Sequence, residues 1–406
     1  MKPSGIEWIG DIPDDWEVKK LKYVSELDPT ISEFLSDNDI VSFAPMECLG
    51  EQTLSPYETE YNKVKGKYTY FANEDIIMAK VTPCFENGNI AIAKNLKNNV
   101  GFGSSELFVF RAKNISNSFL MYSLYSEPFK SLAKSTMYGT GGLKRVSPEF
   151  ILNYKIPFPP VKTQQQIADY LDEKCGEIDA TIAKQKESIE KLKAYKQSLI
   201  SETVTKGLDK SAPLKPSGIK WLGEIPQNAR IIRLRFLSTI QTGDKDTVNR
   251  VENGKYPFYV RSPIVERIDT FSFDGEAILM AGDGVGAGKV FHYVNGKFDY
   301  HQRVYNIHNL KGVLGKFLYY YLRENFYKEI EQSNAKSTVD SIRLPMLLDF
   351  PIIVYPYDLQ KEIVSFLDKK VAEIDTIIIK KQNIIQKLDA YKKSLIFECI
   401  TGKQKI

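Results

Sequence analysis

Polar loops carrying basic, amide and hydroxyl side chains lie in two separate regions of the sequence. In the first region they are residues 80–82, 86–87 and 104–105 and the run YGTGGLKRVS at 138–147. In the second they are residues 283–289, HQR at 301–303 and SNAKSTVDSIR at 333–343. Such side chains can bind phosphates and contact the edges of bases. Any one of these loops, taken alone, is more often an ordinary solvated turn.

The second region also contains AGDGVGAGK at 281–289, which resembles a nucleotide-binding loop. A Walker A motif is excluded, because Asp283 replaces its first glycine and Val290 follows the lysine instead of Ser or Thr. A looser dinucleotide-binding pattern does fit, with glycines at 282 and 284 and Ala287. However, the next residues, KVFHYV, predict a strand where that motif requires a helix. We therefore expect a tight hairpin or a DNA-facing loop.

Other catalytic patterns are weak or absent in the sequence. Pro13-Asp14 followed by Glu17-x-Lys19 spells a nuclease-like PD…ExK, but the acidic residues are crowded into one short segment. The three histidines form no HExxH motif, and no GxSxG or amino-methyltransferase motif is present. The four cysteines lack CxxC spacing, which argues against a zinc ribbon or a disulfide framework. We predict no catalytic and no metal site on this chain, which looks like a positioning protein.

Two internal repeats occur in the same order in the chain. The first pairs MKPSGIEWIGDIPDDWEVKKLKYVSEL at 1–27 with LKPSGIKWLGEIPQNARIIRLRFLSTI at 214–240. The second pairs residues 164–205 with residues 360–401, where about half of the positions are identical. Two copies with a period of roughly 200 residues indicate a duplicated domain rather than a solenoid. The chain is therefore two copies of one plan: an opening segment, a variable body and a long helix.

The second repeat has coiled-coil periodicity in both copies. Polar residues interrupt the two apolar seams at matching places, Gln185 with Lys381 and Lys196 with Lys392, and such breaks can fix register and partner number. A helix this long needs a partner to bury its stripe, so we expect the two to pack on each other. Two unrelated core helices are the alternative. The predicted seam residues are Leu171, Ile178, Ile182, Ile189, Leu192, Leu199, Leu367, Ile374, Ile378, Ile385, Leu388 and Leu395.

The segments between the repeats are unlike each other, and both are rich in short strand-like runs followed by one helical stretch. We predict an α+β chain in which β-rich bodies alternate with long helices. The predicted boundaries are 1–160 for the first body, 161–206 for the first long helix, 207–213 for a linker, 214–356 for the second body and 357–406 for the second long helix.

Length and composition set further bounds. A chain of 406 residues can hold two or three cores. Its net charge of +4 permits a polyanionic partner without indicating one. Apolar runs such as FLYYYL fall far short of the roughly 20 residues of a membrane helix. MKPSGIEW lacks the apolar core of a signal peptide. With the scattered cysteines, this predicts a cytoplasmic protein with no membrane partner.

The sequence resembles the specificity (S) subunit of type I restriction–modification systems. The likeness lies in PSGIEWIGDIP…WEVKKLKYV and PSGIKWLGEIP, and in DIIMAKVTPCFENGNIAIA…GFGSSELFVFRA of the first body. It extends to QQQIADYLDEKCGEIDATIAKQKESIEKLKAYKQSLI of the first helix. It covers essentially the whole chain, including the order of the two copies.

The resemblance implies a concrete function. Each body would be a target-recognition domain that reads one half of a bipartite, asymmetric site on double-stranded DNA. The two helices would pack as an antiparallel coiled coil in a pseudo-twofold duplication, set the gap between the halves and dock two methyltransferase subunits. Restriction/translocase subunits would join through the assembly. Catalysis, with S-adenosylmethionine, ATP and Mg²⁺, would belong to those partners and not to this chain.

Base-reading residues cannot be carried over by motif, because recognition domains differ between family members. Our predicted DNA-binding residues therefore come from the polar loops. They are Lys80, Thr82, Asn87, Ser105, Thr140, Lys144 and Arg145 in the first body and Asp283, Lys289, His301, Gln302, Arg303, Lys336 and Arg343 in the second. Two rival interpretations stay open: a stand-alone DNA-modifying enzyme, suggested by the PD…ExK pattern and the glycine-rich loop, and a coiled-coil scaffold that does not touch DNA.

Overall fold

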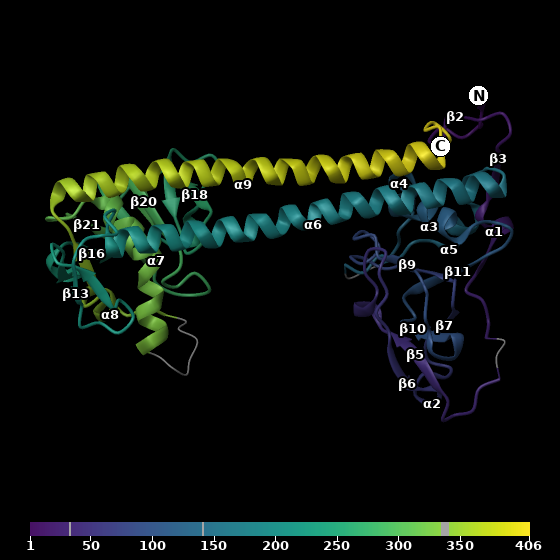
Figure 1. The fold of residues 1–406 in the computed structure, drawn as a ribbon, viewed down its shortest axis with the longest axis horizontal. Coiled ribbons are helices and arrows are strands. Elements are labelled where there is room, and N and C mark those ends of the chain that lie inside the picture. The colour runs from purple at the N-terminus through teal and green to yellow at the C-terminus, as the bar shows by residue number, and fades with distance from the viewer. Residues whose placement is uncertain (32–33, 140–141, 334–340) are drawn as a thin grey trace. The chain divides into compact units, whose positions relative to one another are not determined.

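The computed structural model describes residues 1–31, 34–139, 142–333 and 341–406. They form two compact units, the first made of residues 1–185 and 383–406 and the second of residues 186–382. Each unit holds one body together with a part of each of the two long helices, α6 (Val161–Lys206) and α9 (Tyr357–Ile400), which Figure 1 shows as continuous.

The opening segment of each copy is tied to the end of its own body. In the first unit β1 (Lys2–Pro3) pairs with β2 (Asp11–Ile12), and β3 (Glu17–Lys20) pairs with β12 (Lys155–Phe158). The second unit repeats this with β13 (Leu214–Pro216) on β14 (Glu224–Pro226) and β15 (Arg230–Arg233) on β22 (Pro351–Val354). The repeated segments thus meet at the start of each long helix.

Aromatic stacking strengthens the same junction in both units. Trp8 stacks on Tyr154 with ring centroids 5.5 Å apart, and Trp221 stacks on Phe350 at 5.9 Å. Such offset aromatic pairs add stability beyond the area they bury. The opening repeat therefore has a structural role, because in each unit its tryptophan packs where the body joins the long helix.

The first body contains two four-stranded sheets. One has the order β6-β5-β10-β7 and the other the order β4-β11-β8-β9. The strands are β4 (Ser25–Leu27), β5 (Ile40–Ala44), β6 (Tyr57–Glu60), β7 (Thr69–Ala72), β8 (Ile76–Ala79), β9 (Ile90–Ile92), β10 (Val100–Gly103) and β11 (Leu107–Ala112). The helices are α1 (Leu21–Val24), α2 (Tyr61–Val64), α3 (Asn117–Tyr125), α4 (Glu127–Ser135) and α5 (Pro148–Asn153).

In the described part of the second body six strands form a sheet of order β16-β21-β19-β20-β17-β18. The strands are β16 (Thr239–Thr242), β17 (Tyr256–Tyr259), β18 (Val265–Ile268), β19 (Phe273–Ala281), β20 (Phe291–Tyr300) and β21 (Val304–His308), and the helices are α7 (Gly315–Ser333) and α8 (Leu344–Leu348). The strands β19 and β20 pair antiparallel around the glycine-rich loop. A hairpin is therefore present as predicted, but its connection, residues 282–290, is longer than a tight turn, and the helix that a dinucleotide-binding motif would need does not follow it.

The long helices pack on each other in both units. In the first unit the N-terminal part of α6, including Leu171, shares a core with Leu395 and Ile396 from the C-terminal part of α9. In the second unit the ends are exchanged, and Ile200 of α6 shares a core with Leu367 of α9. The helices therefore run antiparallel. All twelve predicted seam residues are buried or half-buried, as a/d positions should be.

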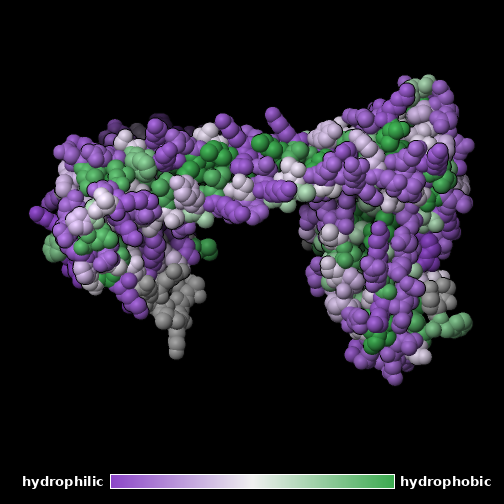
Figure 2. All heavy atoms as spheres, in the orientation of Figure 1, coloured by the Kyte–Doolittle hydropathy of each residue, from purple (hydrophilic) through white to green (hydrophobic). Residues whose placement is uncertain are grey.

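Two of the predicted polar interruptions are ion pairs across this seam. Lys392 of α9 pairs with Asp179 of α6 in the first unit, and Lys196 of α6 pairs with Asp375 of α9 in the second. These lysines occupy equivalent positions in the second repeat, and so do the aspartates. Several apolar or aromatic side chains of α9 are exposed, namely Ile377, Ile379, Ile384 and Tyr391. Figure 2 shows hydrophobic residues at the surface along the helices.

A buried glutamine fixes the start of each long helix to its body. Gln164 accepts a hydrogen bond from the Ser116 backbone N–H at 2.8 Å and donates one to the Pro159 carbonyl at 2.8 Å. Its equivalent, Gln360, accepts from the Leu314 N–H and donates to the Tyr355 carbonyl, both at 2.8 Å. Both side chains are fully buried. Each glutamine therefore satisfies main-chain groups that water cannot reach.

Candidate nucleic-acid interface

The first polar surface forms where three distant parts of the first body meet. The Lys80 N–H, just after β8, donates to the carbonyl of Glu106 in the turn before β11 at 3.0 Å. The Val146 N–H, in the loop that follows α4, donates to the Lys80 carbonyl at 2.9 Å. We call these backbone hydrogen bonds at 80, 106 and 146 the backbone frame. It brings together side chains that lie far apart in the sequence.

An arginine and a carboxylate occupy the first frame. Arg145 donates from Nε to Glu106 Oε2 at 2.8 Å and from Nη2 to Glu106 Oε1 at 2.6 Å. This bidentate bond lowers the pKa of Glu106, and the nearby charge of Lys80 lowers it further. Both side chains remain accessible, at 38% for Arg145 and 28% for Glu106. The pair is therefore a fixed guanidinium at the protein surface.

Thr82 holds the loop next to this pair. Its hydroxyl donates to the Gly142 carbonyl at 3.1 Å and accepts from the Lys144 N–H at 3.0 Å. Lys144 itself is exposed. The structure thus brings together four of the predicted residues of the first body: Lys80, Thr82, Lys144 and Arg145.

Two of the remaining predictions for the first body are exposed in nearby turns. Ser105 is exposed in the turn that contains Glu106, and Asn87 is exposed in the turn after β8. Thr140 lies outside the described residues.

The second body has the same frame with different side chains. The Gly282 N–H, just after β19, donates to the carbonyl of Arg303 at 2.8 Å. The Ile342 N–H donates back to the Gly282 carbonyl at 2.6 Å. The order of elements is also the same: a buried strand, a turn before the next strand, and the loop after the helix. The two dissimilar bodies therefore present side chains from equivalent places.

A polar pocket of about 230 Å³ opens at this second frame. It brings together Asp283, Gln302, Arg303 and Arg343, four of the residues predicted from the sequence. Asp283 accepts a hydrogen bond from Nη1 of Arg261 at 3.1 Å, and Nε of Arg303 lies 3.7 Å from its other oxygen. One carboxylate thus sits between two arginines, with the arginine side chains 44% and 65% exposed.

The other three predictions for the second body have different surroundings. His301 is 2% exposed, and its Nδ1 accepts from the Arg303 N–H at 2.9 Å, so it lies beneath the loop and shapes it. Burial lowers the pKa of His301. Lys289 lies over the ring of Tyr327, with Nζ 4.3 Å from the centroid, in a separate pocket beside α6 and α7. Lys336 falls outside the part of the chain that the structure describes.

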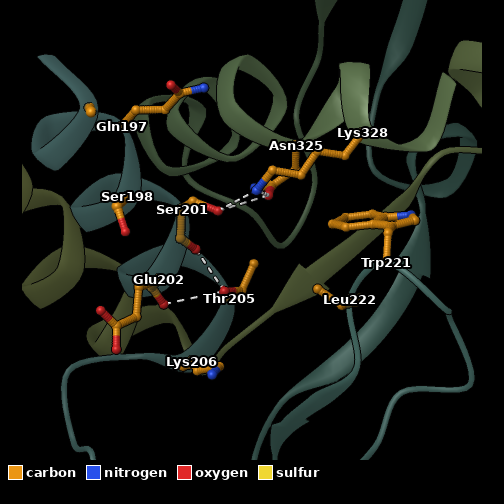
Figure 3. A pocket seen from close by; sticks show the side chains of 11 residues that line it. Gln197, Ser198, Ser201, Glu202, Thr205, Lys206, Trp221, Leu222, Asn325 and Lys328 are labelled. Atoms are coloured by element: carbon orange, nitrogen blue, oxygen red, sulfur yellow. Dashed lines mark hydrogen bonds between the residues drawn. The ribbon is translucent and has the colours of Figure 1, made fainter. Parts of the chain in front are cut away.

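A second kind of surface lies at the junction of the repeated elements. Figure 3 shows a pocket of about 590 Å³ lined by the last turns of α6, by Trp221 and Leu222 and by α7. Within it Nζ of Lys328 donates to Ser201 Oγ at 2.6 Å, and that hydroxyl donates to Asn325 at 3.2 Å. Burial lowers the pKa of Lys328. The pocket thus joins repeated parts of the chain, the end of α6 with Trp221 and Leu222, to α7 of the second body.

The family assignment follows from comparison with known proteins. The family model for the type I restriction modification DNA specificity domain matches residues 13–193 and again residues 228–389. The chain belongs to this family. The double match agrees with the two internal copies, and it confirms the family resemblance noted in the sequence.

Relatives in the same family are similar over different lengths. The EcoEI and EcoAI specificity subunits of Escherichia coli are 38% and 40% identical over 162 residues. Each alignment covers 39% of this chain and 27% of the relative, so the match spans about a quarter of those relatives. The MjaVIII specificity subunit of Methanocaldococcus jannaschii is 25% identical over 97% of this chain and 94% of its own.

Solved structures share the fold of this specificity-family chain. A structure described as the structural basis of complex assembly and conformational transition of the type I R-M system has a TM-score of 0.76, with 17% identity over 97% of this chain and 100% of its own. The HsdS subunit from Thermoanaerobacter tengcongensis has a TM-score of 0.54, with 16% identity over 97% and 98%. These likenesses confirm an α+β fold with two bodies and two paired long helices.

Three further observations concern features that the sequence argued against: a metal site, a nuclease motif and a membrane helix. Among the described residues, no group of three or more His, Cys, Asp or Glu side chains is placed to hold a metal ion. In the PD…ExK segment, Glu17 instead pairs with Lys19 at 3.1 Å on the exposed strand β3. No helix within the described ranges is both long and apolar enough to cross a membrane.

Sequence reasoning missed the partners that fix the predicted arginines. Glu106 stands in an otherwise ordinary turn, and Arg261 follows a short aromatic strand. The sequence does contain a signal for both residues, because Glu106 and Arg261 are charged residues close to the end of a strand with an apolar or aromatic sequence. Only the fold, however, shows that Glu106 meets Arg145 and that Arg261 meets Asp283.

Proposed function

We propose that this chain is the noncatalytic DNA-recognition subunit of a type I restriction–modification complex, and that each body reads one half of a bipartite, asymmetric site. The observation that carries the proposal is the shared backbone frame, which presents Glu106 and Arg145 in one body and Asp283 and Arg303 in the other. The two bodies have the same backbone hydrogen bonds but display different side chains there. This arrangement suits two domains that recognise two different DNA sequences.

The DNA-facing residues follow from accessibility. We infer that Lys80, Ser105, Lys144 and Arg145 face DNA from the first body, with Thr82 holding their loop. In the second body we infer the same of Asp283, Gln302, Arg303 and Arg343, with His301 holding the loop from below. Four other residues stay proposed DNA contacts, although they are not members of these two groups: Asn87, Thr140, Lys289 and Lys336.

The long helices would serve two purposes in this proposal. Their antiparallel packing would set the gap between the half-sites, and their shared surfaces would dock two methyltransferase subunits. The apolar residues exposed on α9 support docking, and so does the pocket of Figure 3, because part of its lining, the end of α6 with Trp221 and Leu222, belongs to the repeats. Restriction/translocase subunits would join the same assembly. S-adenosylmethionine, ATP and Mg²⁺ would bind to those partners.

Methylation mapping tests the function directly. The chain is produced with its neighbouring methyltransferase subunit in a host without adenine methylation, and modified adenines are mapped by long-read sequencing. We expect two short specified halves around an unspecified gap. Replacing residues 28–160 by another body should then change one half only. A contiguous motif would contradict two separate readers, and a stable complex without modification or salt-sensitive DNA binding would favour a protein scaffold.

A further inference from the structure

We propose that Arg145 reads a guanine in the half-site of the first body, and that Glu106 is the positioning residue that aims it. The inference rests on the proposed function, because it assigns a base to the surface described above. It concerns the chemistry of one guanidinium and one base edge.

The donor geometry of Arg145 favours guanine. Glu106 occupies the Nε and Nη2 edge of the guanidinium through the bonds at 2.8 and 2.6 Å. A guanidinium has five N–H donors, so the two hydrogens of Nη1 and the second hydrogen of Nη2 are not used by this fork and bond no other side chain among the described residues. In the major groove guanine offers two acceptors side by side, O6 and N7, whereas adenine pairs its N7 with a donor, the N6 amino group. Two parallel donors therefore fit guanine and oppose adenine.

Both ends of the pair are held by the main chain, so little freedom is lost on binding. Arg145 exchanges two backbone hydrogen bonds with Tyr138, at 2.8 and 3.1 Å. The Glu106 carbonyl accepts from the Lys80 N–H, and the Glu106 N–H donates to Ser104 Oγ at 3.2 Å. A long side chain normally loses rotamer entropy when it binds. Folding already restricts Arg145 in this case, so less rotamer entropy is lost when it contacts a base.

A second arginine fork in the same body shows what a purely structural pair looks like. Arg111 donates from Nε and Nη2 to both oxygens of Asp75, at 2.9 and 2.7 Å. The Asp75 side chain, however, is 2% exposed and also accepts from the Ala72 N–H at 2.8 Å. It ties the start of β8 to β11. Glu106 is 28% exposed and lies in a turn at the surface, while the two arginines are similarly exposed, at 32% for Arg111 and 38% for Arg145. The two forks therefore share geometry and differ in how deeply the carboxylate is buried.

The test uses the complete complex with its methyltransferase subunit. Arg145→Lys keeps the charge and removes the fork, Glu106→Gln keeps Arg145 and removes its charged anchor, and Arg111→Lys is the matched control. Methylation is measured at the wild-type motif and at every single-base variant of it. We expect Arg145→Lys to lower discrimination at one guanine of the first half by roughly 5- to 150-fold, Glu106→Gln to lower it less, and Arg111→Lys to leave the motif unchanged.

The outcomes separate this inference from the proposed function. A wild-type motif that is not split defeats the proposed function itself. A split motif without guanine in the half that follows the first body overturns the inference alone. So does an Arg145→Lys complex that weakens all sequences alike, since that is the signature of a phosphate contact. If Arg145→Lys fails to assemble, Glu106→Gln decides, and an unchanged motif in that variant also overturns the inference.

Discussion

Lys392 of α9 donates hydrogen bonds to both carboxylate oxygens of Asp179 on α6, at 2.9 and 2.8 Å. The lysine side chain is only 8% exposed, whereas the aspartate is 50% exposed. The equivalent residues of the repeat, Lys196 and Asp375, form the same pair in the second unit with the helices exchanged. Each helix therefore supplies one lysine, buried in α9 and half-buried in α6, and one aspartate. A shift in register would leave the buried lysine without its counter-ion.

Reversing this charge should destabilise the first unit. We expect Lys392→Glu to lower its free energy of unfolding by about 2 kcal/mol or more, because two carboxylates would then face each other at a partly buried seam. The double variant Lys392→Glu with Asp179→Lys should recover most of the loss, which a double-mutant cycle in urea measures. Lys393→Glu is the matched control, because it reverses an exposed ion pair, that of Lys393 with Glu127 at 3.1 Å, in which the side chains are 53% and 46% exposed. An equal loss in the control would show that the seam pair has no special role.

Removing the buried glutamine should loosen the joint between the first body and its helix. Gln164→Leu leaves the Ser116 N–H and the Pro159 carbonyl without their partner. Unsatisfied buried groups of this kind cost about 1–3 kcal/mol. We expect a loss in that range in denaturant unfolding. The exposed neighbour Gln165→Leu should change stability by less than about 0.5 kcal/mol, and a comparable effect of the two substitutions would contradict the assigned role.

Acidification should weaken the second unit more than the first. All three histidines of the chain lie in the second body, and burial lowers the pKa of each of them from the ordinary 6.5. Because their folded pKa values are depressed, their stabilising effect is complete above about pH 6.5 and is lost as the pH falls toward the folded values. Hydrogen exchange at pH 7.5 and pH 5.5 should show protection falling in residues 214–308 with less change in the first body.

One of these histidines connects stability to the polar pocket. His301 accepts the Arg303 N–H through Nδ1, which a protonated imidazole cannot do. His301→Asn keeps an acceptor and removes the titration, so we expect it to flatten the pH dependence of exchange at 301–303. A variant that keeps the full pH dependence would assign the effect to the other two histidines.

Changing the carboxylate of the second frame should alter the second half-site only. Asp283 lies between Arg261 and Arg303, and Asp283→Ala releases both guanidinium groups. We expect discrimination at one base of the second half to fall roughly tenfold or more, with the first half unchanged in methylation mapping. Asp274→Ala, at the exposed start of the same strand β19, is the control. A change in the first half would argue against independent readers.

The sequence predicted the repeated parts well, for a physical reason. A heptad stripe and a repeated tryptophan reflect local geometry, so both could be read along the chain. The same applies to the strand after the glycine-rich loop, which is β20. The bodies hold contacts between distant residues, such as Arg145 with Glu106, and periodicity carries no signal for such pairs. His301 shows the other limit, because a polar residue in a polar loop gives no sign that it points inward.

The backbone frame has a consequence for how new specificities arise. Its hydrogen bonds use only N–H and carbonyl groups, at 80, 106 and 146 in one body and at 282, 303 and 342 in the other. Substituting the side chains displayed on it removes none of those bonds. If each body reads one half-site, as proposed, target choice is free to drift by point substitution, one half at a time, while the long helices stay the same. Variation in two independent halves multiplies, so a few alternatives in each body would generate a large repertoire of DNA targets from one assembly.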